Sequence, residues 1–333
     1  MRRLIVWILI VAGIWMGLWA AGSIAYERGL NAWIEARRDE GWAADVAQLN
    51  VAGFPNRFDT TLTDVRMADP ATGIAWSAPF VQFLSLAYKP YQVIAVLPGQ
   101  HVFSTPLQTM TISHDRARGS LFLEPSTSLA LDRSVIVVDA MDIASTLGWT
   151  LALDQGRFAA EKVAATQNGY RIGAELDGLE PSSGTRLVLD PGGILPDRIE
   201  TMRLDATLDF DGPWDRGAIE VARPQITAID LDDLSARWGD VTIRAAGELT
   251  VDDAGVPTGR ITVKAVEWRR LLDMAIGTGL LADTFRPALE RALELMAALE
   301  GPPNTLDAPL TFENGFISFG PIPLGPAPRL VIR

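Results

Sequence analysis

The pattern of apolar and charged positions separates a short apolar segment at the N-terminus from a long body. Leu4–Ala25 contains no charged residue. As an α-helix, these 22 residues extend about 33 Å, at roughly 1.5 Å per residue. The hydrocarbon core of a bilayer is about 30 Å thick. The pattern therefore predicts a transmembrane anchor over residues 1–25.

Flanking residues predict the orientation of this anchor. Arg2 and Arg3 precede it, and the positive-inside rule holds such an end in the cytoplasm. Trp15 and Trp19 lie in its far half, as expected of an interfacial belt. The alternative is a cleaved signal peptide, with Ser23–Ala25 as small residues at the cleavage site. Both interpretations export the body, and the anchored one predicts a single-pass inner-membrane protein with its body in the periplasm.

A second helical pattern continues over residues 26–43. Tyr26, Leu30, Trp33 and Ile34 recur at the spacing of one helix face, while charged residues take the other faces. This pattern predicts an amphipathic stalk helix. Its apolar face either lies on the membrane surface or packs against the body.

Apolar and polar residues alternate with a period of two through most of the body. The most regular run is Met202–Phe210, and Val241–Val251 and Ile261–Ala265 repeat it across a turn rich in Asp, Gly and Pro. Such alternation is typical of half-buried strands, and short turns between consecutive strands favour antiparallel pairing. Strands do not alternate regularly with helices, which disfavours a doubly wound α/β fold.

These patterns predict a β-rich α+β protein with large antiparallel curved sheets or a β-groove. A first β region covers residues 44–180 and a second covers residues 200–333. Residues 181–199 are rich in Gly and Pro and form a linker or boundary between them. Further strands are predicted at residues 58–67, 107–113, 135–138, 150–154, 171–176 and 225–231.

The apolar face of the strands in the second region is the candidate site. Side chains at alternate positions of a strand share one face. If this face is open, it offers an apolar groove; if it is closed, it is core, and the sequence leaves both possible. Its members are Met202, Leu204, Leu208, Phe210, Ile243, Leu249, Val251, Ile261 and Val263.

Two helices are predicted near residues 268–300. Trp268–Leu281 is apolar on nearly all sides, which suggests burial. Asp283 can cap the next helix. The apolar face of that helix is core or, in a minority interpretation, a movable lid. Its members are Phe285, Leu289, Leu293, Met296 and Leu299.

Composition narrows the chemistry that the body can perform. The 333 residues include no Cys and only two His, His101 and His114, which are expected in or near turns. The absence of Cys removes disulfides, thiolate metal sites and Cys nucleophiles. The sequence contains no phosphate-binding loop, nucleophile elbow, zinc-protease or dinucleotide motif. It therefore predicts no catalytic residue, no metal site and no cofactor.

Charge argues against nucleic acid as a partner. The chain has 29 Lys+Arg against 41 Asp+Glu, a net charge of −12, whereas phosphate binding needs clustered cations. Without Arg2 and Arg3, residues 26–333 have 27 positive and 41 negative charges, or −14. Anionic lipid repels such a body. It is expected to stand off the membrane unless a local basic patch such as Arg37–Arg38 docks it.

Several turn and strand-edge motifs occur together. They are Gly53–Pro55 with Arg57–Phe58, Tyr88–Pro90, Pro98–Gln100, and the tail segments Pro309–Gly315 and Gly320–Pro328. In these motifs the chain resembles an uncharacterised family of Gram-negative envelope proteins, a domain of unknown function with an N-terminal membrane anchor. The resemblance covers nearly the whole chain and implies no active site.

A second resemblance concerns the late hairpin. Trp238–Gly239, the alternating strands and the apolar helix after them resemble parts of the AsmA-like envelope proteins. That resemblance covers about a quarter of the chain. It implies long β-grooves and lipid traffic at the cell envelope.

Three functions are consistent with the sequence. The first is a membrane-tethered, non-enzymatic envelope protein that binds lipid or an amphipathic ligand in an apolar β-groove. The alternative is an interaction scaffold for an envelope assembly, with no small ligand. A hydrolase needs two carboxylates about 5–10 Å apart across a cleft, and the scattered Asp and Glu isolate no such pair. The expected partners are the inner membrane and a lipid or envelope protein, with no nucleic acid.

Overall fold

The computed structural model divides into two compact units. Unit 1 comprises residues 1–125 and 136–148, and unit 2 comprises residues 126–135 and 149–333. The structure describes residues 1–279, 281–300, 302–320 and 322–332, and only the backbone of residues 220, 285, 299 and 300. Within each unit the strands pair antiparallel.

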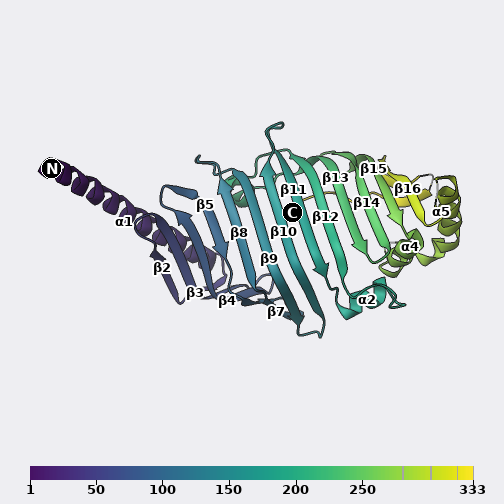
Figure 1. Cartoon of the computed structure of the whole chain (residues 1–333), viewed down its shortest axis with the longest axis horizontal. Helices are drawn as coiled ribbons and strands as arrows, with labels where there is room; N and C mark the ends of the chain where they lie inside the picture. The colour runs from purple at the N-terminus through teal and green to yellow at the C-terminus, as the bar shows by residue number, and fades with distance from the viewer. Residues whose placement is uncertain (280, 301, 321, 333) are drawn as a thin grey trace. The chain divides into compact units, whose positions relative to one another are not determined.

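Unit 1 begins with α1 (Arg2–Asp39), one continuous helix that includes both the predicted anchor and the predicted stalk. No proline interrupts it. Among the described residues, α1 is the one helix long and apolar enough to cross a membrane. Its N-terminal part projects away from the strands, and its C-terminal half lies beside β2 (Gln48–Ala52) and β3 (Arg57–Asp69) (Figure 1).

The strands of unit 1 form a meander around β3. Strand β3 pairs with β1, β2 and β4. Strand β4 pairs in turn with both β5 and β6. Further along, β5 pairs with β8, β6 pairs with β7, and β7 pairs with β9. The bounds of the others are β1 (Ala43–Asp45), β4 (Ile74–Leu86), β5 (Lys89–Val96), β6 (Gln100–Ser104), β7 (Thr109–Ser113), β8 (Arg116–Leu123) and β9 (Leu131–Ser145), whose residues from 136 onward belong to this unit.

The strands of unit 1 are bent, and at the bend the side chains that face the core shift by one position along β3. β5 and β6 lie along β4 as one strand interrupted between them. Asp64 in β3 has a φ of +50°, a left-handed conformation that breaks the regular pleat. Leu62 and Val65 are three positions apart, which simple alternation would place on opposite faces. Both belong to one buried cluster, so the break at Asp64 keeps the same face apolar on both sides of the bend.

The core of unit 1 joins α1 to the sheet. Ile34 of α1, at 4% exposure, packs with buried side chains of β1, β3 and β4. Leu30 packs against the same cluster from one turn earlier in the helix. The apolar face predicted for residues 26–43 therefore packs against the body.

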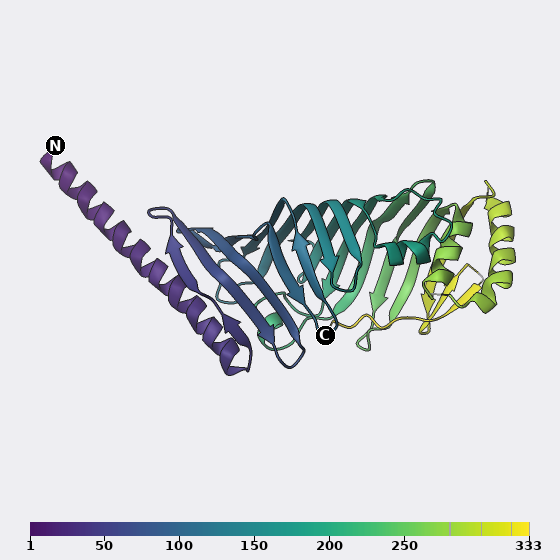
Figure 2. The same cartoon turned by 90° about the horizontal axis from the view of Figure 1, so that it is seen from below.

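Unit 2 is a meander in which each strand from β10 to β18 pairs with the next (Figures 1 and 2). Its strands are β10 (Thr150–Lys162), β11 (Gly169–Leu179), β12 (Ile199–Phe210), β13 (Ile226–Trp238), β14 (Val241–Val251), β15 (Pro257–Val266), β16 (Thr305–Glu313), β17 (Phe316–Phe319) and β18 (Ile322–Pro326). Its helices are α2 (Ser183–Leu189), α3 (Arg216–Glu220), α4 (Trp268–Gly277), the 3₁₀ turn η1 (Asp283–Phe285) and α5 (Arg286–Glu300).

One face of the unit 2 sheet is apolar along its whole pairing register. Leu204 lies opposite Ala174 on β11 and Leu234 on β13, and Ile243 lies opposite Ala236 and Ala265. The register shifts between β12 and β13 at Asp205/Ala206, a bulge that bends the strands.

The helices α4 and α5 cover one end of this apolar face. Trp268 and Leu272 of α4 pack with Leu289 and Leu293 of α5 in one buried cluster, which includes Leu306 of β16. The indole N–H of Trp268 donates to the carbonyl of Pro303 at 3.0 Å, so burial leaves its polar atom satisfied.

The structure confirms the predicted fold class and both late helices. Each predicted strand segment overlaps an observed strand, and the observed strands are mostly longer. The turn at Asn314–Gly315, with φ of +53° and +77°, joins β16 to β17 as a hairpin turn requires. Elsewhere, α4 ends at Gly277 and Asp283 lies inside the 3₁₀ turn η1, where it bonds Arg286 instead of capping a helix. The predicted face residues Phe285 and Leu299 lie outside the described side chains.

The division into units falls elsewhere than the predicted boundary. Residues 181–199 contain α2 and lie within unit 2, whereas the division lies near residues 125–149. Strand β9 contributes residues 131–135 to unit 2 and its remainder to unit 1. A boundary inside a strand has no Gly- or Pro-rich signal, because the strand itself is regular.

We expect two neighbouring leucines of α5 to differ sharply in their effect on stability. Leu293→Ala removes a side chain that is 7% exposed and should lower the unfolding free energy by about 2–5 kcal/mol. Leu295→Ala removes one that is 65% exposed and should change it by less than about 0.5 kcal/mol. Urea unfolding of the detergent-solubilised chain measures both. Equal losses would contradict the packing of α5.

Candidate functional site

An apolar cleft of about 460 Å³ lies between α1 and the strands of unit 1. All twelve side chains that line it are apolar. Helix α1 forms one wall, and β3, β4 and β5 with their flanking residues form the other. The lining consists of Leu30, Trp33, Ile34, Val46, Leu62, Val65, Met67, Trp76, Val81, Phe83, Ala95 and Leu97.

The neighbouring α1 residues Ile34 and Trp33 both line the cleft but differ in exposure. Ile34 is buried at the bottom, whereas Trp33 is 52% exposed and lies against the guanidinium of Arg37, 5.9 Å from the ring centroid. The small side chain of Ala95 leaves room at the opposite wall. The lining of the cleft is therefore apolar throughout, and Trp33 is the most exposed of the α1 residues that line it.

A hydrogen bond joins the end of α1 to β1, and local ion pairs neutralise the two arginines beside it. Arg38 donates to the carbonyl of Ala44 at 2.7 Å and to Glu35 at 2.5 Å. Arg37 pairs with Glu40 at 2.7 Å. Both arginines of the proposed basic patch thus have acidic partners, so Arg37–Arg38 is not a free cationic patch.

The two histidines of the chain lie together behind one wall of this cleft. His101 in β6 and His114 after β7 have ring centroids 5.5 Å apart, and His101 is 6.2 Å from Trp76, which lines the cleft. Both are buried, and His101 Nδ1 and His114 Nε2 have no hydrogen-bond partner in the described part of the chain. Burial lowers the pKa of both imidazoles below 6.5, and the neighbouring His114 lowers that of His101 further.

Sequence reasoning missed this pair because the β6–β7 hairpin creates it. His101 lies opposite Ile112 in the register, two residues from His114. The available signal was a hairpin centred near Leu107, which would have placed positions 101 and 114 close together. Among the described residues no group of three His, Asp or Glu side chains could hold a metal ion.

The nine residues predicted as a groove or core face all lie on β12, β14 and β15 of unit 2. Phe210, Leu249 and Val251 are buried. Leu204, Leu208, Ile261 and Val263 pack, half-buried, against a small cluster of Ala206, Leu231 and Ala245. Met202 and Ile243 are also half-buried. The structure thus brings four of the nine to one cluster, and the use of this face as a groove stays a prediction.

A wider hollow in unit 2, of about 640 Å³, is lined mainly by charged side chains. Asp205 and Asp233 lie directly opposite each other on β12 and β13, so they are the two carboxylates to consider for a hydrolase. However, Arg171 donates to Asp205 from Nε at 2.7 Å, and this hydrogen bond lowers the pKa of Asp205. A general acid needs a raised pKa, so Asp205 is suited to an ion pair with Arg171 and not to that role.

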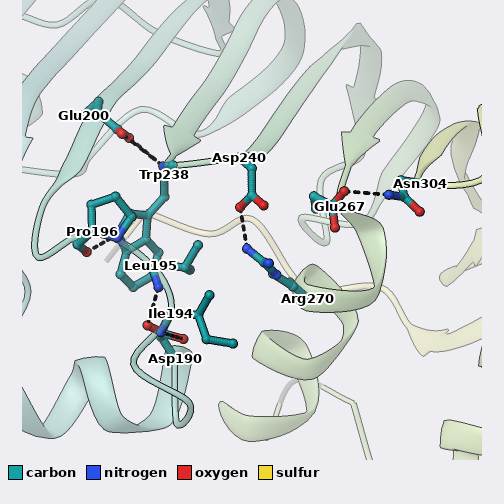
Figure 3. A network of polar contacts seen from close by, with 11 residues as sticks. Asp190, Ile194, Leu195, Pro196, Glu200, Trp238, Asp240, Glu267, Arg270 and Asn304 are labelled. Atoms are coloured by element: carbon teal, nitrogen blue, oxygen red, sulfur yellow. Dashed lines mark hydrogen bonds and ion pairs between the residues drawn. The ribbon is translucent and has the colours of Figure 1, made fainter.

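The Trp238–Gly239 motif makes structural contacts (Figure 3). The indole of Trp238 donates to the carbonyl of Pro196 at 2.8 Å, and the N–H of Gly239 donates to Glu200 at 2.9 Å. The carboxylate of Asp190 accepts two backbone N–H groups of its own loop, at 2.9 and 3.2 Å. These bonds attach the Gly- and Pro-rich stretch 181–199 to the turn between β13 and β14, so it is not a free linker.

Comparison with known proteins identifies the family. Residues 19–328 match the model of a family described as an uncharacterised protein conserved in bacteria, DUF2125. The chain belongs to this family. The DUF2125 match begins within α1 and extends through both units, which confirms the predicted membership of an uncharacterised family. No curated protein and no solved structure matches the chain, and the resemblance to AsmA-like proteins stays a prediction.

We expect the histidine pair to make the stability of unit 1 depend on pH. Above the ordinary His pKa of 6.5, both imidazoles are neutral in the folded and unfolded chain. As the pH falls below this value, the unfolded chain binds protons first, so stability falls until the lowered folded pKa values are passed. Melting temperatures measured from about pH 7 to about pH 5 should therefore decrease.

The matched variant is His101→Gln with His114→Gln, which removes both titrating groups. Its absolute stability can differ, but its melting temperature should change less over the same pH range. An identical slope in the variant and the parent chain would show that the histidines do not titrate as described.

Proposed function

We propose that this DUF2125 protein is a membrane-anchored, non-enzymatic protein that binds the acyl chain of a lipid or of a similar amphipathic ligand in the unit 1 cleft. The observation that carries this proposal is the lining: twelve apolar side chains around about 460 Å³. Ligand sites typically measure about 300–1,000 Å³ and are mostly apolar.

The energetics of the cleft favour an alkyl occupant. Burial of each methylene group contributes about 0.8 kcal/mol, so ten methylenes supply about 8 kcal/mol before the entropic cost of binding. The only polar side-chain groups on this lining are the indole N–H groups of Trp33 and Trp76, so a polar ligand would bury most of its polar groups without a partner, which is unfavourable. A lipid with its headgroup beside the exposed Trp33 satisfies both conditions.

Contacts along α1 support retention of the N-terminal segment as an anchor. Trp19 packs on Phe54 and Phe58, with centroids 5.4 and 6.1 Å apart, and Phe58 is 5% exposed. Cleavage after Ala25 would remove Trp19, uncover Phe58 and take away the ring contact of Phe54. With Arg2 and Arg3 on the cytoplasmic side, the strands that follow a retained anchor would lie in the periplasm.

The carboxylates of unit 2 support a non-enzymatic role. Asp205 is held ionised by Arg171, and Glu175 pairs with Arg203 at 2.8 Å. Carboxylates used in this way do not supply the protonated acid that glycoside hydrolysis requires.

Filling the cleft should abolish ligand binding. Ala95→Phe places a ring in the apolar volume, whereas Ala71→Phe places the same ring in the exposed turn between β3 and β4. We expect the parent chain and Ala71→Phe to bind a fluorescent fatty acid in detergent, and Ala95→Phe to bind it at least about tenfold more weakly, a loss of about 1.4 kcal/mol.

Native mass spectrometry of the membrane-extracted chain provides the second readout. The parent chain should carry a stoichiometric lipid mass that Ala95→Phe lacks. A chain that is lipid-free and does not bind the probe contradicts the proposal. If crosslinking in membranes then captures a stoichiometric protein partner, the interaction scaffold replaces it.

A further inference from the structure

Two neighbouring turns of unit 1 lie beside α1 where the apolar segment meets the strands. The β2–β3 turn contains Phe54, and the β4–β5 turn contains Tyr88. The N–H of Ala87 donates to the carbonyl of Asn56 at 2.8 Å, which joins the two turns. Phe54 is 51% exposed and Tyr88 is 59% exposed.

The exposed part of α1 is too short to span a bilayer if the strands and turns stay wholly outside the membrane. Every side chain from Met1 to Leu18 is exposed, and the first partly buried one is Trp19. Leu4–Leu18 is 15 residues long and extends only about 22 Å. A bilayer core of about 30 Å needs about 20 helical residues, which from Leu4 reaches Ser23. The turn that contacts Trp15 and Trp19 must therefore enter the bilayer with the helix.

The backbone of the β2–β3 turn is equipped for such an environment. The indole N–H groups of Trp15 and Trp19 donate to the carbonyls of Pro55 and Arg57, at 2.9 and 2.8 Å. The N–H of Arg57 donates to the carbonyl of Gly53 at 2.9 Å, and Pro55 has no N–H. Backbone groups that enter lipid need partners within the protein, and these contacts supply partners for several of them.

The side chains around the two turns match the membrane–water interface. Aromatic residues gather at the headgroup level. Here Trp19 of α1 packs on Phe54, and the hydroxyl of Tyr26 donates to the carbonyl of Pro90, two residues after the exposed Tyr88. Lys89 is exposed beside Tyr88, and cations of this kind reach toward phosphates. The surface formed by the two turns is thus suited to anionic lipid, although the body as a whole is acidic.

We infer that the β2–β3 and β4–β5 turns insert into the interfacial region of the periplasmic leaflet, so that unit 1 is seated in the bilayer surface and does not stand off from it. The inference rests on the proposed retention of α1 as an anchor. It also relates the cleft to the membrane, since Leu30 and Ile34 follow Tyr26 by four and eight residues, or about 6 and 12 Å along the helix. A lipid would need to rise only this far from its leaflet to enter the cleft.

Depth-dependent fluorescence tests the inference directly. The chain has no Cys, so Phe54→Cys, Asn56→Cys and Ala71→Cys each provide one thiol for the environment-sensitive fluorophore NBD. Position 71 lies at the other end of β3 and is the matched control. The full-length variants are reconstituted in phosphatidylethanolamine–phosphatidylglycerol vesicles, with or without doxyl-labelled phosphatidylcholine.

We expect NBD at positions 54 and 56 to emit at shorter wavelength and to be quenched by the doxyl lipid by about twofold or more, while NBD at position 71 is unchanged. Asn56→Cys leaves the aromatic cluster intact, so it reports even if Phe54→Cys perturbs the turn. If all three positions behave alike while the chain resists carbonate extraction, the inference fails and the anchor stands. If carbonate releases the chain, or its N-terminus begins after residue 25, the proposed anchoring fails as well.

Discussion

The packing of α1 against the ring of Phe58 is the contact on which the rest of unit 1 depends. A Cβ at Gly22 would lie 2.6 Å from the ring of Phe58, so glycine allows the helix to approach the strand at this point. Because α1 continues without interruption to Asp39, this contact also sets where the later residues fall. Leu30 and Ile34 then lie over the strands and form one wall of the cleft. A helix displaced by a side chain at position 22 would open both the aromatic contacts and the cleft.

A second constraint is the repeated bending of the strands. Regular alternation gives a sheet one apolar and one polar face, but a long flat apolar face would remain exposed. In unit 1 the left-handed residue Asp64 resets the alternation, so Leu62 and Val65 share a face. In unit 2 the bulge at Asp205/Ala206 bends β12 against β13. Side chains on the inner side of such bends bury one another in part, which explains why Leu204 and Ile261 are half-buried.

The sequence predicted the elements better than it predicted the site. The uncharged run at Leu4–Ala25 and the period-two alternation are local signals, and each corresponds to an observed element. The cleft has no local signal. Its walls come from α1 and from strands up to residue 97, and its volume depends on how closely the helix approaches. The histidine pair was missed for the same reason, since a hairpin register brings positions 101 and 114 together.

The sequence alone determined that this chain has one apolar helix at its N-terminus, a β-rich body and no Cys chemistry, because composition and short-range periodicity are properties of the chain itself. It also determined the family, whose model matches residues 19–328 of the chain. Only the tertiary structure decided that α1 packs against the strands of unit 1, that His101 and His114 lie together, and that an apolar cleft opens beside the helix. These features arise from contacts between residues distant in sequence, and no local pattern encodes the distances between them.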